Sequence, residues 1–335
     1  MKNTLLPEPK FTALLEKIAN SGGEDHHAFS ELAEASCQVE PKHISAWEKY
    51  LRWETLSIKY RRKPKKWQFW RKQPAFPEWV NIASVDGYER ESGIQAITTG
   101  APSAIFFALL IRRLNDWVPQ VRAAAGKKVV VVARASESDI IANALCAVLP
   151  RWTSWGRWKE QEKLRLMEVV ELDHVSRALC EKLISNTSGP MSQVLSQVGR
   201  SDAIDENLPD IAVKSIQPAV RARSYRMLLE RKSVWVEGRA WKWTDIRYSE
   251  GKYVPVLGER KIHLAVPLIA TIEQALSDSS PAVRRVGAEK FIQHLDEFGE
   301  RAVHISAKIA SDRSSSVAER GRFAQRRLRK LNSSQ

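Results

Sequence analysis

The chain has few cysteines, and they lie far apart in its 335 residues. Cys37, Cys146 and Cys180 are odd in number and form no Cys-x-x-Cys pair, so the sequence predicts neither a disulfide framework nor a cysteine metal site. Their neighbours are small or apolar, which is typical of buried cysteines that pack as small hydrophobic residues.

Long apolar segments are also missing. The longest uninterrupted apolar run, Ala104 to Ile111, has eight residues, whereas a helix that spans a bilayer needs about 20. The first residues of the sequence lack the apolar core of a signal peptide. We therefore expect a cytoplasmic protein with no membrane partner.

Motifs of catalysis and of metal binding are absent as well. The sequence has no Gly-x-Ser-x-Gly elbow and no phosphate-binding glycine loop. Its Glu-x-x-His pairs, Glu40/His43 and Glu171/His174, lack the further carboxylates of a di-metal site, and Pro41 interrupts the first pair. We predict no catalytic residue, no metal and no cofactor.

Positive charge is what the chain has in excess. It contains 53 Lys and Arg against 39 Asp and Glu, a net charge of +14. Such an excess favours a polyanionic partner, either nucleic acid or an acidic protein. The hydrophobic content of 43% and the charged content of 27% are values of a folded globular chain.

A short motif recurs along the sequence. It consists of Asp or Ser, then Pro three residues later, Val five later, Arg six later and a small residue nine later. Clear copies begin at Asp116, Ser215 and Asp278, a weaker copy begins at Asp312, and a degenerate one begins at Ser84. The copies at Asp278 and Asp312 are 34 residues apart, which is about the length of a helix pair with its turns.

Each motif position suits the start of a helix that packs closely on a neighbour. Asp or Ser caps the free amides of a helix start, and proline near that start has no hydrogen bond to lose. The valine and the small residue, four positions apart, share one face, where another helix must approach.

The motif resembles the HEAT repeat, and its short bacterial form most closely. In that family the aspartate and the arginine belong to the second helix of each pair and bond between adjacent repeats as a ladder. The pairs that inherit this role by resemblance are Asp116/Arg122, Asp278/Arg284 and, in part, Ser215/Arg221. At Asp312 the arginine position is Ala318, so the ladder is expected to end there in a capping repeat.

The resemblance implies an all-α fold, an α-solenoid of HEAT-like helix pairs with a small β-hairpin insertion. We expect a helical head with a basic segment over residues 1–72 and the solenoid over 73–335. The hairpin is predicted at about 233–262, because Trp241 and Trp243 alternate with polar residues. Gly238 and Gly251 read as its turns, which leaves a third strand possible within the segment.

Basic and aromatic residues gather in three segments, near 59–72, 151–159 and 235–253. Lysine and arginine neutralise phosphates, and exposed aromatic rings stack on unpaired bases. The alternative is that the rings pack onto the fold while the charges stay in solvent. The predicted partner-binding residues are Lys59, Arg61, Arg62, Lys63, Lys65, Lys66, Trp67, Trp70, Arg71, Lys72, Arg151, Trp155, Arg157, Trp158, Trp241 and Trp243.

These features favour a non-enzymatic scaffold or adaptor that binds a protein or a nucleic acid through basic, tryptophan-rich surfaces. The second hypothesis is an alkylpurine DNA glycosylase, because some HEAT-like solenoids have that activity and hold damaged DNA in a basic groove with Trp, Asp and Arg. No motif of this chain aligns with that family residue by residue. The sequence predicts no oligomeric state.

Overall fold

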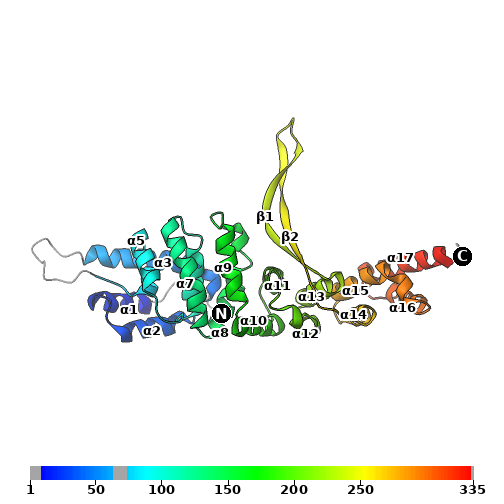
Figure 1. Ribbon diagram of the computed structural model, residues 1–335, viewed down its shortest axis with the longest axis horizontal. Coiled ribbons are helices and arrows are strands. Elements are labelled where there is room, and N and C mark those ends of the chain that lie inside the picture. The colour runs from blue at the N-terminus through cyan, green and yellow to red at the C-terminus, as the bar shows by residue number, and fades with distance from the viewer. Residues whose placement is uncertain (1–8, 63–73, 333–335) are drawn as a thin grey trace, which may run out of the picture. The chain divides into compact units, whose positions relative to one another are not determined.

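The computed structural model describes residues 9–62 and 74–332. Within these residues the chain forms seventeen α-helices and one two-stranded antiparallel sheet, so the predicted helical fold with a β-hairpin is confirmed. None of the helices described is both long enough and apolar enough to cross a membrane. The chain divides into two compact units between Ala178 and Leu179, and each unit is described by itself (Figure 1).

The first unit consists of helices that pack both on their neighbours in sequence and on alternate helices. Its elements are α1 (Pro9–Asn20), α2 (His26–Ser36), α3 (Ile44–Arg61), α4 (Glu78–Asn81), α5 (Gly87–Ala96), α6 (Ala104–Arg113), α7 (Pro119–Arg134), α8 (Ser138–Val148), α9 (Glu160–Val170) and the start of α10 (Asp173–Ser185). Helix α1 packs on α2 and α4 on α5, and among the alternate helices α5 packs on α7, α7 on α9 and α6 on α8. The apolar run of the sequence lies in α6, which is buried from Ile105 to Ile111.

The second unit contains three consecutive helix pairs. Its elements after α10 are α11 (Met191–Val198), α12 (Leu208–Lys214), α13 (Pro218–Glu230), β1 (Lys232–Asp245), β2 (Glu250–Lys261), α14 (Leu268–Leu276), α15 (Pro281–Gln293), α16 (Arg301–Ala310) and α17 (Ser315–Asn332). Helices α12 and α13, α14 and α15, and α16 and α17 pack as pairs, and α13, α15 and α17 contact one another in order. The hairpin is inserted between the first two pairs.

The motif proline begins helices as predicted, but the motif Asp or Ser is not the helix cap: it lies two residues before the N-cap, which is Val118 in α7, Gln217 in α13 and Ser280 in α15. Pro119, Pro218 and Pro281 are the first residues of α7, α13 and α15, where a missing amide hydrogen costs nothing. The small residue allows close packing: a Cβ added to Gly287 would lie 2.9 Å from the backbone nitrogen of Leu276, the last residue of α14. A Cβ added to Gly321 would lie 2.2 Å from the backbone nitrogen of Ala310, the last residue of α16.

The first unit contains helices from both sides of the expected boundary at residues 72 and 73. Head helix α3 packs on α6, and Leu51 and Ile58 of α3 are fully buried. Helices of the head and the first motif copies therefore share one compact unit, and the contact boundary lies about a hundred residues further along the chain.

Candidate functional site: the arginine ladder and the exposed hairpin

A ladder of bidentate arginine–aspartate pairs joins successive motif copies within each unit. In each pair the arginine donates from Nε and Nη2 to both carboxylate oxygens, at 2.7 to 2.9 Å. The pairs are Arg90–Asp116, Arg221–Asp278 and Arg284–Asp312. Each arginine also donates from Nη1 to the backbone carbonyl six residues earlier, as Arg284 does to Asp278 at 3.0 Å.

The ladder shows where the repeat pattern is kept and where it fails. Arg221 and Asp278 are 57 residues apart and still pair, so the hairpin is inserted without breaking the ladder. Arg122 bonds the carbonyl of Asp116 at 2.7 Å, but its next acidic neighbour is Glu162, at 3.9 Å. At the last motif copy Ala318 has no guanidinium, so the ladder ends at Asp312 as predicted.

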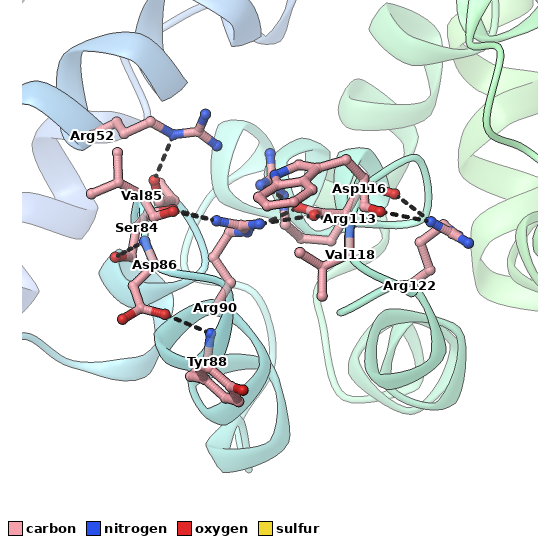
Figure 2. A network of polar contacts seen from close by, with 12 residues as sticks. Arg52, Ser84, Val85, Asp86, Tyr88, Arg90, Arg113, Asp116, Val118 and Arg122 are labelled. Carbon is pink, nitrogen blue, oxygen red and sulfur yellow. Dashed lines mark hydrogen bonds and ion pairs between the residues drawn. The ribbon is translucent and has the colours of Figure 1, made fainter. Parts of the chain in front are cut away.

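The first pair of the ladder is the centre of a buried polar network (Figure 2). Asp116 also accepts bonds from Arg113 Nη1 at 2.9 Å and from the Val118 amide at 3.0 Å. Arg113 in turn bonds Glu48 of α3, which accepts a further bond from Arg52 at 2.6 Å. The network therefore fastens head helix α3 to the first motif copies.

The charges of this network are balanced against burial. Burial opposes ionisation of Asp116, but bonds from Arg90 and Val118 and the positive charges nearby outweigh it and lower the pKa of that carboxyl. For Glu48 burial also opposes ionisation, and the charge of Arg113, followed by those of its other arginine neighbours, lowers the pKa. Both groups are carboxylates near neutral pH.

The ladder aspartates, Asp116, Asp278 and Asp312, are occupied by these structural bonds. Both oxygens of each carboxylate accept from an arginine, and one oxygen of each also accepts from the backbone amide two residues later. A free catalytic carboxylate, as the glycosylase hypothesis requires, is therefore not supplied by these three positions.

The distal half of the hairpin is exposed. Strands β1 and β2 extend away from α11 and α13 (Figure 1), and pair from Lys232 opposite Lys261 to Asp245 opposite Glu250. The predicted excursion is thus a hairpin of two strands. The glycine turns were wrong, since the chain reverses at residues 246–249 and Gly238 lies beside a bulge.

Gly251 has a different role from the predicted turn. It lies beneath the indole of Trp241, where an added Cβ would come within 2.5 Å of the ring. Gly258 lies in the same way beneath Trp235: a Cβ added to Gly258 would lie 2.4 Å from the indole nitrogen of Trp235. In both places glycine gives room to an aromatic ring that crosses from the neighbouring strand.

One side of the hairpin carries an aromatic face, composed of Val236, Trp241, Trp243, Tyr253 and Leu257. Trp241 packs edge-on against Trp243, with ring centroids 5.5 Å apart, and against Tyr253 across the strands at 5.0 Å. The exposed fractions of these three rings are 44%, 51% and 67%. Val236 and Leu257, opposite each other and also exposed, lie on the same side nearer the base, beyond the pair Arg239 and Pro255.

The other side of the hairpin carries two lysines in register. Lys242 and Lys252 are direct cross-strand partners, an arrangement in which like charges oppose pairing. Within the described part of the chain neither lysine forms an ion pair with a carboxylate. Sequence reasoning missed both lysines and Tyr253, because only the strand register places them.

The base of the hairpin is held firmly by its unit. Arg260 donates to both carboxylate oxygens of Asp205, at 2.6 and 2.8 Å, and to the carbonyl of Gly199 at 2.8 Å. On the other strand Ser196 of α11 donates to the carbonyl of Val234 at 3.0 Å. These bonds fix the base, while the distal half presents its side chains to solvent.

The basic segment near residue 60 is only partly described. Lys59 bonds Glu89 at 2.6 Å, and both Arg61 and Arg62 lie near Glu16, at 3.2 and 4.0 Å. These three cations are thus engaged with carboxylates of their own unit. The remaining predicted residues, Lys63, Lys65, Lys66, Trp67, Trp70, Arg71 and Lys72, lie outside the described residues.

The cluster near residue 155 packs largely on itself. Trp158 contacts the buried Trp152 at 5.1 Å and Trp155 at 5.2 Å between ring centroids. Arg151 and Arg157 stay exposed. This cluster includes the buried Trp152, whereas Trp241, Trp243 and Tyr253 of the hairpin are all exposed.

Comparison with known proteins gives no match to the chain, either among protein-family models or among characterised sequences. The described residues also include no group of three or more His, Cys, Asp or Glu side chains that could hold a metal ion. The hairpin, with its aromatic face and its lysine pair, is therefore the feature with the clearest chemistry for binding.

Proposed function

We propose that the chain is a HEAT-type repeat protein, a scaffold or adaptor whose hairpin binds nucleic acid by stacking unpaired bases on the aromatic face. The observation that carries the proposal is the aromatic face itself, exposed on a strand pair whose reverse side carries Lys242 and Lys252. Aromatic rings take up bases of any sequence, and lysines neutralise the adjoining phosphates.

The repeat assignment is supported by three features that recur together. The motif proline begins the second helix of a pair, the small residue meets the end of the first helix, and the arginine bonds the aspartate of the next copy. These features suit a HEAT-type stack, in which helix pairs bury their faces against neighbouring pairs.

Exposure of the rings is what turns the hairpin into a binding element. Single exposed apolar residues are ordinary, but a continuous apolar patch marks an interaction surface. Stacking of a base on an aromatic side chain contributes about 1–3 kcal/mol. Two bases on Trp241 and Trp243 would therefore change the affinity by roughly 30-fold or more, at about tenfold for each 1.4 kcal/mol.

The test is fluorescence anisotropy with labelled single-stranded DNA, single-stranded RNA and duplex DNA at two salt concentrations. We expect single strands to bind more tightly than duplex, and the double variant Trp241→Ala/Trp243→Ala to lose at least tenfold in affinity. Trp53→Ala is the matched control, because Trp53 is exposed on α3 and is not part of the hairpin.

Two results would contradict the proposal. One is the absence of binding to any nucleic acid at low salt. The other is an equal loss for the Trp53 control and the hairpin variant, which would mean that the hairpin rings have no special role. Binding of polyglutamate without binding of nucleic acid would assign the hairpin to an acidic protein instead.

A further inference from the structure

A groove of the second unit lies where α11, α13, α15 and α17 begin. It is lined by first-turn residues of α11, α13, α15 and α17 and by side chains of the following turns, and it has a volume of about 580 Å³. Its polar lining consists of Ser192, Arg223, Arg226, Arg285, Ser314 and Ser316. Among the described residues that line this groove none is Asp or Glu, whereas another groove of the unit contains Glu273 and Asp312.

Guanidinium groups outnumber carboxylates around this groove. A single carboxylate, that of Glu289 in α15, lies within ion-pair distance of three arginines. These are Arg226, Arg285 and Arg320, at 3.1, 3.4 and 2.7 Å. Glu289 offsets one positive charge of the three, so the cluster keeps an excess of positive charge.

Arg223 adds a further cation without a carboxylate. Its guanidinium donates to Ser192 Oγ at 3.1 Å and to the carbonyl of Val234 at 3.4 Å, and no described acidic group forms an ion pair with it. Burial and then the nearby charge of Arg226 lower the pKa of Arg223. Desolvating a charge without a counter-charge is unfavourable, and an anion in the groove would relieve it.

The backbone adds to the same field. Four helices of eight or more residues, α11, α13, α15 and α17, present first-turn residues to the groove. The amino end of a helix carries a partial positive charge and free amides, which favour anions. Here the positive helix ends act together with the three arginines that line the groove, Arg223, Arg226 and Arg285. The bond from Arg223 to Val234 places the groove at the base of β1.

We infer that this groove binds the phosphodiester backbone of the nucleic acid whose bases stack on the hairpin. The inference rests on the proposed function and adds the second half of the contact. Arginine suits this role because its planar fork binds phosphate through two hydrogen bonds. Helices packed about 8–10 Å apart form a row long enough for several consecutive phosphates.

The experiment separates phosphates from bases by using the full chain with two labelled strands of equal length. One is ordinary single-stranded DNA, and the other is built of abasic sites and has only the phosphodiester chain. The groove variant is Arg226→Ala/Arg285→Ala, in which both side chains are about half exposed and paired with a glutamate. The control is Arg165→Ala/Arg301→Ala, which removes two exposed, glutamate-paired cations outside the groove.

We expect the groove variant to bind the abasic strand at least tenfold more weakly than the control does. Because each phosphate contact on a single strand contributes about 0.7 to the slope of log affinity against log salt, the slope should fall by about 1.4. The variant Arg226→Lys/Arg285→Lys keeps the charge and guards against loss of folding. It should keep the slope and lose part of the affinity.

The outcomes distinguish the groove from the hairpin. Equal binding of the abasic strand by the groove variant and the control would overturn the inference, as would polyglutamate binding as tightly as the abasic strand. Displacement of the strand by stoichiometric inorganic pyrophosphate would also overturn it, in favour of a small-anion site. If Trp241→Ala/Trp243→Ala binds ordinary single-stranded DNA as tightly as the unchanged chain does, while the groove variant still binds the abasic strand more weakly, only the proposed hairpin function would be contradicted.

Discussion

The ladder predicts a graded response when its aspartates are replaced by asparagine. The substitution keeps the shape of the side chain and removes its charge, so each arginine loses its counter-charge. The exposed fractions of the three aspartate side chains are 2% for Asp116, 11% for Asp278 and 13% for Asp312. The cost should follow that order, because solvent compensates an unpaired guanidinium where it has access.

The magnitudes follow from burial. Asp116→Asn leaves Arg90 and Arg113, both almost fully buried, without their shared carboxylate, and breaking a buried pair costs about 3–5 kcal/mol. At Asp312 the partner Arg284 is partly exposed, and we expect a cost of roughly 1–2 kcal/mol, between the values for exposed and buried pairs. Asp278→Asn should lie between the two. The whole free energy of unfolding of a domain is only about 5–15 kcal/mol, so these losses are large.

Urea unfolding, followed by circular dichroism and tryptophan fluorescence, measures these changes. Asp116→Asn should shift the transition of the first unit, and the other two substitutions that of the second. Asp210→Asn is the matched control, because Asp210 forms an exposed ion pair with Lys214 at 2.9 Å; its effect should stay below about 0.5 kcal/mol. Equal losses at all four positions, or a loss at Asp312 as large as at Asp116, would refute the reasoning.

Three further outcomes follow from the packing and the charges. Gly321→Ala should lower the thermal midpoint of the second unit in a melting curve, because the new methyl group meets the backbone of Ala310. Gly251→Val should displace the Trp241 ring, which near-ultraviolet circular dichroism detects, while the helical signal stays constant. Acid should destabilise both units: the pKa values of the ladder aspartates are lowered from 3.8, so their contribution is complete above that pH and is lost as the pH falls through the lower folded values. Stability measured from pH 7 down to pH 2 should therefore fall mainly below about pH 4, and a flat profile would contradict this.

The sequence predicted the features that depend on local chemistry. The motif proline defines where α13 and α15 begin, because it acts on the helix start itself. The end of the ladder was predicted from Ala318, which stands at the motif position where the other copies have an arginine. The hairpin was predicted from the alternation at Trp241 and Trp243, a period that a helix does not produce.

The features that depend on register or on distant packing could not be predicted. Gly251 was taken as a turn because a glycine beneath a ring and a glycine in a turn are the same letter in the sequence. Arg226 and Arg285 come from helices on either side of the hairpin insertion, and no local pattern joins them. Lys59 belonged to the predicted binding segment, but Glu89, thirty residues away, binds it.

Photo-crosslinking tests the central claim most directly, because it reports where a nucleic acid touches the chain. A single-stranded oligonucleotide with photoreactive bases is irradiated with the full chain, and the linked peptides are identified by mass spectrometry. We predict that the linked residues fall on the distal hairpin, at Trp241, Trp243 or Tyr253, and that ordinary DNA in excess suppresses the links. Crosslinks found only outside residues 232–261 would contradict the account.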